Sequence, residues 1–150
     1  MKKAAIFFVS MLLLAALSVT CFAQDHSSDM VTVDSYSWQL TDEIIVVRTI
    51  QTSPAMMRST KSASMTDDYY YSGKKVATMV LSGSFYYDGS TARATGAKKS
   101  YSTASGWSYS GGDAYISGNS VKVNGSFVGS KTYPVNMTLS CSSSGVITEG

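Results

Sequence analysis

The sequence predicts an all-β protein, an antiparallel two-sheet β-sandwich of immunoglobulin-like architecture, with a small β-barrel as the alternative. Three observations lead to this prediction. Apolar residues recur with a period of two over several stretches, which is the pattern of a strand with one buried face. Gly, Asn and Asp turn signals separate these stretches at short intervals. No window after the first 23 residues shows a helical stripe with caps.

The first 23 residues are predicted to be a secretory signal peptide. Lys2 and Lys3 form a positive start, residues 4–19 are almost wholly apolar, and Ala23 precedes the polar Gln24. We therefore expect cleavage after Ala23 and a secreted, extracellular product.

Lipid attachment at Cys21 is the alternative, because LSVTC resembles a bacterial lipoprotein box. A lipid would tether the protein to a membrane, whereas simple cleavage releases it. A permanent membrane span is less favoured, since the apolar run is shorter than the ~20 residues that a span needs and has no basic residue directly after it.

Cleavage leaves one domain, residues 24–150, of which residues 24–30 are expected to be disordered. Removing 23 of 150 residues leaves 127, enough for a single hydrophobic core. Loss of Lys2 and Lys3 reduces the twelve basic residues to ten, equal to the ten acidic ones, so no basic face points to nucleic acid. Cys141 is then the only cysteine, and an internal disulfide is excluded.

Seven to nine short strands are expected in this domain. The stretch 44–47 is apolar on both sides, as in a covered strand. Residues 52–60 contain Pro54 and are predicted to form a loop, while residues 60–71 are polar and ambiguous. The predicted strands cover residues 31–40, 43–50, 76–87, 114–117, 120–130 and 133–141, with a return strand starting at 91–94.

The stretch 76–87 allows its two faces to be assigned. Tyr86 is expected to point outward with Ser82 and Ser84, and Asp88-Gly89 is a strong turn signal. The predicted inner face consists of Ala77, Met79, Leu81, Gly83, Phe85 and Tyr87. Glycine at position 83 predicts a bulge or a close approach by another strand.

Two further stretches alternate in the same way. In 120–130 the inner face carries Val121, Val123 and Phe127, and in 133–141 it ends at Cys141, which is expected to be a buried, inert thiol. Pro134 cannot donate to a ladder and should lie at an edge or at the strand entrance.

The sequence offers no catalytic constellation, cofactor site or metal site. His26 is the only histidine and lies close to the predicted mature N-terminus, a poor position for a rigid catalytic base. Asp67-Asp68 lacks the further ligands of a calcium loop and is interpreted as a solvated turn. The ten acidic residues show no pair that stands out as a glycosidase dyad.

Tyrosine is the residue in excess, with ten tyrosines beside two tryptophans. Most are expected to serve the core and the sheet edges, because tyrosine suits half-buried strands. Aromatic faces can also stack on sugar rings. Tyr86, Tyr101, Trp107 and Tyr109 are the candidate ligand-binding residues, because they flank Gly- and Ser-rich loops.

The runs GKKVATMVLSGSFYYDGSTA, SYSTASGW and VNMTLSCSSSG contain the patterns A-T-x-x-L-x-G-x-F-x-Y-x-G and V-x-x-T-L-x-C. With these motifs, residues 60–145 resemble small secreted β-rich proteins of Gram-positive bacteria. These motifs are structural, so the resemblance implies export and a β-fold, and it implies no reaction.

The leading functional hypothesis is a secreted, non-enzymatic β-sandwich that binds a glycan, an envelope polymer or a protein at the cell surface or in the medium. Its partner would be an extracellular ligand or a cell-envelope component. The alternative is a secreted membrane-active toxin or bacteriocin-like protein, with residues 101–110 as an amphipathic hairpin. A carboxylate-dependent hydrolase is the third hypothesis.

Overall fold

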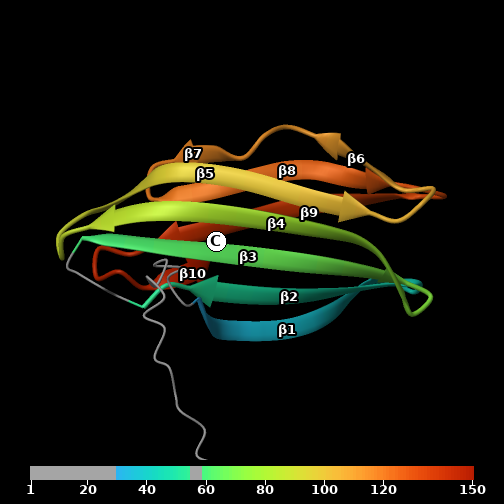
Figure 1. Ribbon diagram of the computed structural model, residues 1–150, viewed down its shortest axis with the longest axis horizontal. Coiled ribbons are helices and arrows are strands. Elements are labelled where there is room, and N and C mark those ends of the chain that lie inside the picture. The colour runs from blue at the N-terminus through green and yellow to red at the C-terminus, as the bar shows by residue number, and fades with distance from the viewer. Residues whose placement is uncertain (1–29, 55–58) are drawn as a thin grey trace, which may run out of the picture.

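Ten strands form two five-stranded antiparallel sheets in the computed structural model, which describes residues 30–54 and 59–150 (Figure 1). The first sheet has the order β1-β2-β3-β4-β5, and the second has the order β10-β9-β8-β6, with β7 also paired to β8. The first sheet contains β1 (Val31–Thr41), β2 (Ile44–Thr52), β3 (Thr60–Tyr71), β4 (Lys74–Tyr87) and β5 (Ala92–Thr103). The second contains β6 (Ser108–Gly111), β7 (Tyr115–Ser117), β8 (Ser120–Val128), β9 (Thr132–Cys141) and β10 (Ile147–Glu149).

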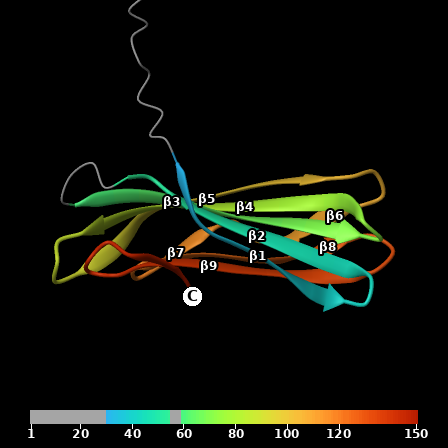
Figure 2. The ribbon, with the colours of Figure 1, turned by 90° about the horizontal axis from the view of Figure 1, so that it is seen from below.

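The predicted sandwich is confirmed, because the two sheets pack face to face and do not close into a barrel (Figure 2). The first sheet is a simple meander in which every strand pairs with its neighbours in sequence. It therefore lacks the Greek-key connections of immunoglobulin domains, although the layered architecture is the same.

The core lies between the sheets and is built from the predicted inner faces. On β4, Met79, Leu81 and Phe85 are fully buried, and their neighbours Val80 and Tyr86 are only half-buried. The alternation predicted for β8 and β9 is also confirmed. The buried side chains of these two strands are Val121, Val123, Phe127, Tyr133, Val135, Met137, Leu139 and Cys141.

The close approach predicted at Gly83 is present. A Cβ at this position would lie 2.8 Å from the Phe85 ring and 2.8 Å from Val121 Cγ2 of the opposite sheet. The register of β4 against β5 shifts at Ser84 and Phe85, immediately beside the glycine. A side chain at position 83 would therefore force the sheets apart or displace the Phe85 ring.

The hairpin turns follow local chemistry. Ser72 and Gly73 both have positive φ, 47° and 77°, and form the tight turn between β3 and β4. Asp88 Oδ1 accepts hydrogen bonds from the backbone N–H groups of Thr91 at 2.7 Å and Ser90 at 2.9 Å. These bonds lower the pKa of Asp88 and hold the predicted turn.

Several sequence expectations are corrected. The ambiguous stretch 60–71 is the central strand β3, whose polar appearance arises because Ser and Thr side chains occupy its outer face. The stretch 44–47 is not covered on both sides, since Ile45 is 49% exposed on the outer face of β2. Strands β6 and β10 were not expected, and they bring the number of strands among the described residues to ten.

Pro134 lies near the start of β9, where β10 does not reach, since β10 pairs only with Leu139–Cys141. This agrees with its expected place at an edge or a strand entrance. The predicted signal peptide, the cleavage site, the lipidation alternative at Cys21, His26 and most of the segment 24–30 lie outside the described residues. Within the described residues no helix is long and apolar enough to cross a membrane.

We expect the Cys141 thiol to react slowly in the folded protein. Cys141 is buried on the inner face of β9, and burial raises the pKa of its thiol while the nearby Lys61 opposes this effect. In a Cys21→Ser variant, which leaves one thiol, a thiol reagent should label native protein slowly and denatured protein fast. Rapid stoichiometric labelling of native protein would contradict the burial of this side chain.

Candidate functional site

The four aromatic residues singled out from the sequence do not meet at one place. Tyr86 stands on the outer face of the first sheet, with Arg93 Cζ 5.1 Å from its ring centre. Tyr101 pairs with Met79, seven residues from Tyr86 along β4, which corresponds to about 23 Å. Tyr86 is therefore remote from the other three.

Tyr101 and Tyr109 do lie together, with ring centres 4.8 Å apart, at the edge between β5 and β6. Lys99 Nζ lies 4.7 Å from the Tyr109 ring, donates to the Gly112 carbonyl and pairs with Asp113 at 3.1 Å. This group closes the gap between the two sheets. Half of the Tyr101 surface remains exposed, so its ligand-binding role stays a prediction.

Trp107 packs into the fold rather than standing free. Its ring stacks on Tyr133 at 5.6 Å and covers Gly129, where a Cβ would lie 2.6 Å from the indole. Tyr71 approaches the same indole at 6.0 Å. These contacts pack Trp107 at the end of the sandwich, and its ligand-binding role stays a prediction.

A second group of residues, at the other edge of the sandwich, was not expected from the sequence. Arg48 on β2 and Asp67 on β3 are paired in register and point between the sheets. Arg48 Nε donates to Asp67 Oδ1 at 2.7 Å, and Nη2 donates to Oδ2 at 2.5 Å. Both residues are buried, and only 1% of the Asp67 surface is exposed. The result is a buried bidentate ion pair, which holds the guanidinium in one orientation.

The interpretation of Asp67-Asp68 as a solvated turn is wrong, because β3 runs through both residues. Successive side chains of a strand point to opposite faces. Asp67 therefore points inward to Arg48, whereas Asp68 lies on the outer face, 2.7 Å from Lys75 Nζ and 2.6 Å from Thr78 Oγ1.

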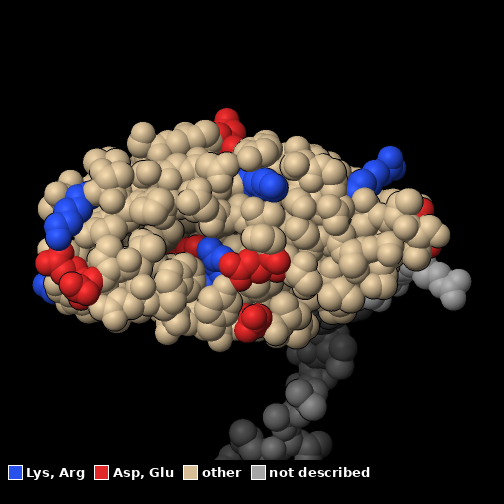
Figure 3. Space-filling view, turned by 180° about the vertical axis from the view of Figure 1, so that it is seen from behind, with Lys and Arg blue, Asp and Glu red and all other residues tan. Residues whose placement is uncertain are grey.

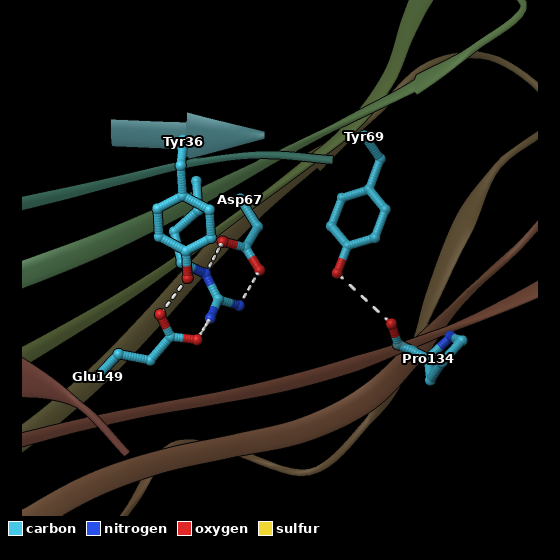
Figure 4. Close-up of polar contacts among 6 residues, drawn as sticks. Tyr36, Asp67, Tyr69, Pro134 and Glu149 are labelled. Atoms are coloured by element: carbon cyan, nitrogen blue, oxygen red, sulfur yellow. Dashed lines mark hydrogen bonds and ion pairs between the residues drawn. The ribbon is translucent and has the colours of Figure 1, made fainter. Parts of the chain in front are cut away.

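Glu149 of β10 and Tyr36 of β1 complete this group. Glu149 Oε1 accepts from Arg48 Nη1, and Glu149 Oε2 accepts from the Tyr36 hydroxyl (Figure 4). We call Tyr36, Arg48, Asp67 and Glu149 the ion cluster. It joins three strands of the first sheet to the last strand of the second.

The electrostatics of the ion cluster reflect its burial. Burial by itself would lower the pKa of Arg48, but the hydrogen bonds and charge of Asp67, together with the charge of Glu149, raise it above its ordinary value. Burial raises the pKa of Asp67, and Arg48 offsets part of this effect. Burial and the bond to Glu149 also raise the pKa of Tyr36. Arg48 is therefore permanently charged and serves as the fixed centre of the cluster.

An aromatic pair lies directly beside the ion cluster. Tyr36 and Trp38 are two residues apart on β1 and share a face, with ring centres 5.7 Å apart. Arg48 Cζ lies 5.0 Å from the Trp38 ring, on the side toward the core. We call Tyr36 and Trp38 the aromatic shelf. Asp34 continues this row, because it pairs with the buried Ile50 and therefore lies on the same face of β1.

The shelf remains partly accessible because the second sheet meets it through β10, whose Glu149 contacts Tyr36 and Arg48. The longer strands β8 and β9 lie against β3, β4 and β5 instead (Figure 1). Tyr36 is 38% exposed, Asp34 is exposed and Trp38 is half-buried. Figure 3 shows this side of the molecule as mostly uncharged, with basic and acidic side chains gathered at a hollow near its middle.

The carboxylates of the ion cluster are already engaged by other side chains. Asp67 and Glu149 share one guanidinium, so their oxygens are occupied by Arg48 and Tyr36 instead of being open as a general acid and base. Across residues 30–54 and 59–150, no group of three His, Cys, Asp or Glu side chains is placed to hold a metal ion.

One sequence signal could have revealed the aromatic shelf. The stretch 31–40 was predicted as a strand, and period two then places Tyr36 and Trp38 on one face. The partnership of Arg48 with Asp67 and Glu149 has no such signal, because these residues lie far apart in the chain.

Comparison with protein-family models, with characterised proteins and with solved structures finds no match to this chain.

Proposed function

We propose that this protein is an exported, non-enzymatic β-sandwich that binds a glycan on the aromatic shelf beside the ion cluster. The observation that supports this proposal best is the Tyr36–Trp38 pair, which stays accessible next to a buried arginine and two carboxylates. The ligand class agrees with the secreted binding role expected from the sequence.

Two physical features support a sugar as the ligand. Aromatic rings present flat apolar faces on which the C–H faces of sugar rings stack, while the exposed Asp34 carboxylate provides a polar group for sugar hydroxyls at the shelf margin. The shelf is also rigid, because Trp38 rests on Arg48, and Asp67 holds Arg48 in place. A preformed surface loses little conformational entropy on binding.

Trp38→Ala is the test of this function. Titration of the full chain with neutral and charged oligosaccharides should reveal binding, and the variant should weaken it at least tenfold, because the larger stacking ring is removed. Tyr86→Ala is the matched control, since it removes an aromatic ring from a different surface. Melting curves of both variants should show that each remains folded. Equal binding by the Trp38 variant and the wild type, with both folded, would contradict the proposal.

The membrane-active alternative stays a prediction. Its expected hairpin, residues 101–110, spans the end of β5 and β6, and these strands belong to different sheets. Among the described residues β5 pairs with β4 and β6 pairs with β8, so these two strands form no hairpin with each other. Leakage of dye from vesicles on addition of the protein would support it.

A further inference from the structure

We propose that the glycan bound by the aromatic shelf is cationic, a polymer of amino sugars with free amines. This inference rests on the proposed function and adds the charge class of the ligand. It follows from the balance of charges around the shelf and from the way in which Arg48 is already engaged.

The charges around the shelf do not cancel. Arg48 contributes one positive charge, and Asp34, Asp67 and Glu149 contribute three negative charges, which leaves a net charge of minus two. Arg48 is the only basic group among those that act on Tyr36 and Asp67. Lys61, the next basic residue on the inner face of β3, lies six residues from Asp67 and donates to the Gly145 carbonyl. The shelf is therefore an acidic surface on a chain with a nearly balanced total charge.

Arg48 is poorly placed to attract an anionic ligand. Its Nε and Nη2 donate to Asp67, and its Nη1 donates to Glu149, so all three nitrogens have carboxylate partners. A uronic acid or a phosphorylated polymer would have to compete with these carboxylates and would meet their repulsion.

Asp34, in contrast to Arg48, is well placed to attract a ligand of opposite charge. It is exposed and, within the part of the chain that the structure describes, it makes no ion pair or side-chain hydrogen bond. Alternate residues of a strand are about 6.6 Å apart, so Trp38, Tyr36 and Asp34 form a row about 13 Å long. Such a row offers two stacking faces followed by a free carboxylate, which suits an extended sugar chain that carries amines. The partly exposed Glu149 carboxylate adds to the attraction.

A matched pair of ligands tests this inference. Binding of the full chain is measured by calorimetry with β-1,4-linked glucosamine oligosaccharides and with their fully N-acetylated counterparts of the same length. In mildly acidic buffer and low salt, the amine form should bind at least tenfold more tightly, a difference of about 1.4 kcal/mol. Salt should reduce this preference, and so should raising the pH until the sugar amines are neutral.

Two variants that each remove one negative charge show where on the surface the preference for the amine form arises. Asp34→Asn should reduce the preference for the amine form several-fold, because it removes the free carboxylate of the row. Asp113→Asn removes the same charge from the other edge of the sandwich, where Asp113 is almost fully exposed, and should leave the preference unchanged. Equal effects of the two variants would overturn the inference, because they would indicate attraction by total charge alone.

The outcomes separate the inference from the proposed function. Equal binding of both sugars, lost in the Trp38→Ala variant, would leave the function standing and overturn the cationic preference. Tighter binding of a uronic acid oligosaccharide than of the amino sugar would also overturn the cationic preference and leave the proposed function standing. Binding of neither sugar class would overturn both proposals. Tight binding of a lysine-rich peptide without binding of the amino sugars would overturn both as well, because it would make the shelf a protein-binding surface.

Discussion

Phe85→Ala is expected to destabilise the folded protein by about 3–5 kcal/mol, the usual cost of truncating a buried phenylalanine. The Phe85 ring is fully buried, and it packs against the space that Gly83 leaves open between the sheets. A loss of this size is a large part of the stability of a domain this small. Urea denaturation with a constant slope would measure it.

Tyr86→Ala is the matched comparison, since it truncates the next residue on the same strand. Tyr86 is half-buried on the outer face, where its main partner is Arg93. Its removal should cost about 1 kcal/mol or less, as surface substitutions do. A greater loss for the Tyr86 variant than for the Phe85 variant would contradict the observed orientation of β4.

Arg48→Met is expected to cost about 3–5 kcal/mol, because it leaves the buried Asp67 carboxylate without its partner. The substitution keeps an unbranched side chain of similar length, so the loss is mainly electrostatic. Glu149 also loses its bond to Arg48, which weakens the attachment of β10. Denaturation at neutral pH would measure the change.

The pH dependence of the stability of the Arg48→Met variant follows from the direction in which the pKa of Asp67 shifts. Burial already raises the pKa of Asp67, and removing Arg48 should raise it further. A carboxyl group whose pKa is higher in the folded than in the unfolded state favours folding at low pH and opposes it as pH rises through the folded value. The defect should therefore shrink toward acid pH, where Asp67 is protonated.

Two further variants identify the cause. Arg48→Met combined with Asp67→Leu should recover most of the loss, because no buried charge remains uncompensated. Lys131→Met breaks the exposed ion pair with Glu43 and should change stability little. A double variant as unstable as the single one would show that packing, and not the isolated charge, explains the defect.

The candidate site could be anticipated only in part. Period two within 31–40 places Tyr36 and Trp38 on one face, yet the sequence does not show that this face is left uncovered. Position beside a Gly- or Ser-rich loop, the reason for choosing Tyr86, Tyr101, Trp107 and Tyr109, is a weaker indication of a binding surface than a shared strand face. Trp107 packs on Tyr133 and Tyr109 on Phe127, because the aromatic residues of such loops can fold back onto the core.

The sequence by itself determined which residues of β4, β8 and β9 face the core, because alternation is a local property of an extended chain. It also determined the tight turn at Asp88-Gly89, where the backbone conformation depends on adjacent residues. Long-range packing decided the rest. The polar β3 becomes a central strand only in the assembled first sheet, because β2 and β4 then provide hydrogen bonds along both of its edges. The side chains of β3 alone do not indicate this position. Only the folded chain brings Glu149 to Arg48 across 101 residues of sequence, because β10 must first pair with β9 and reach past the core to β1.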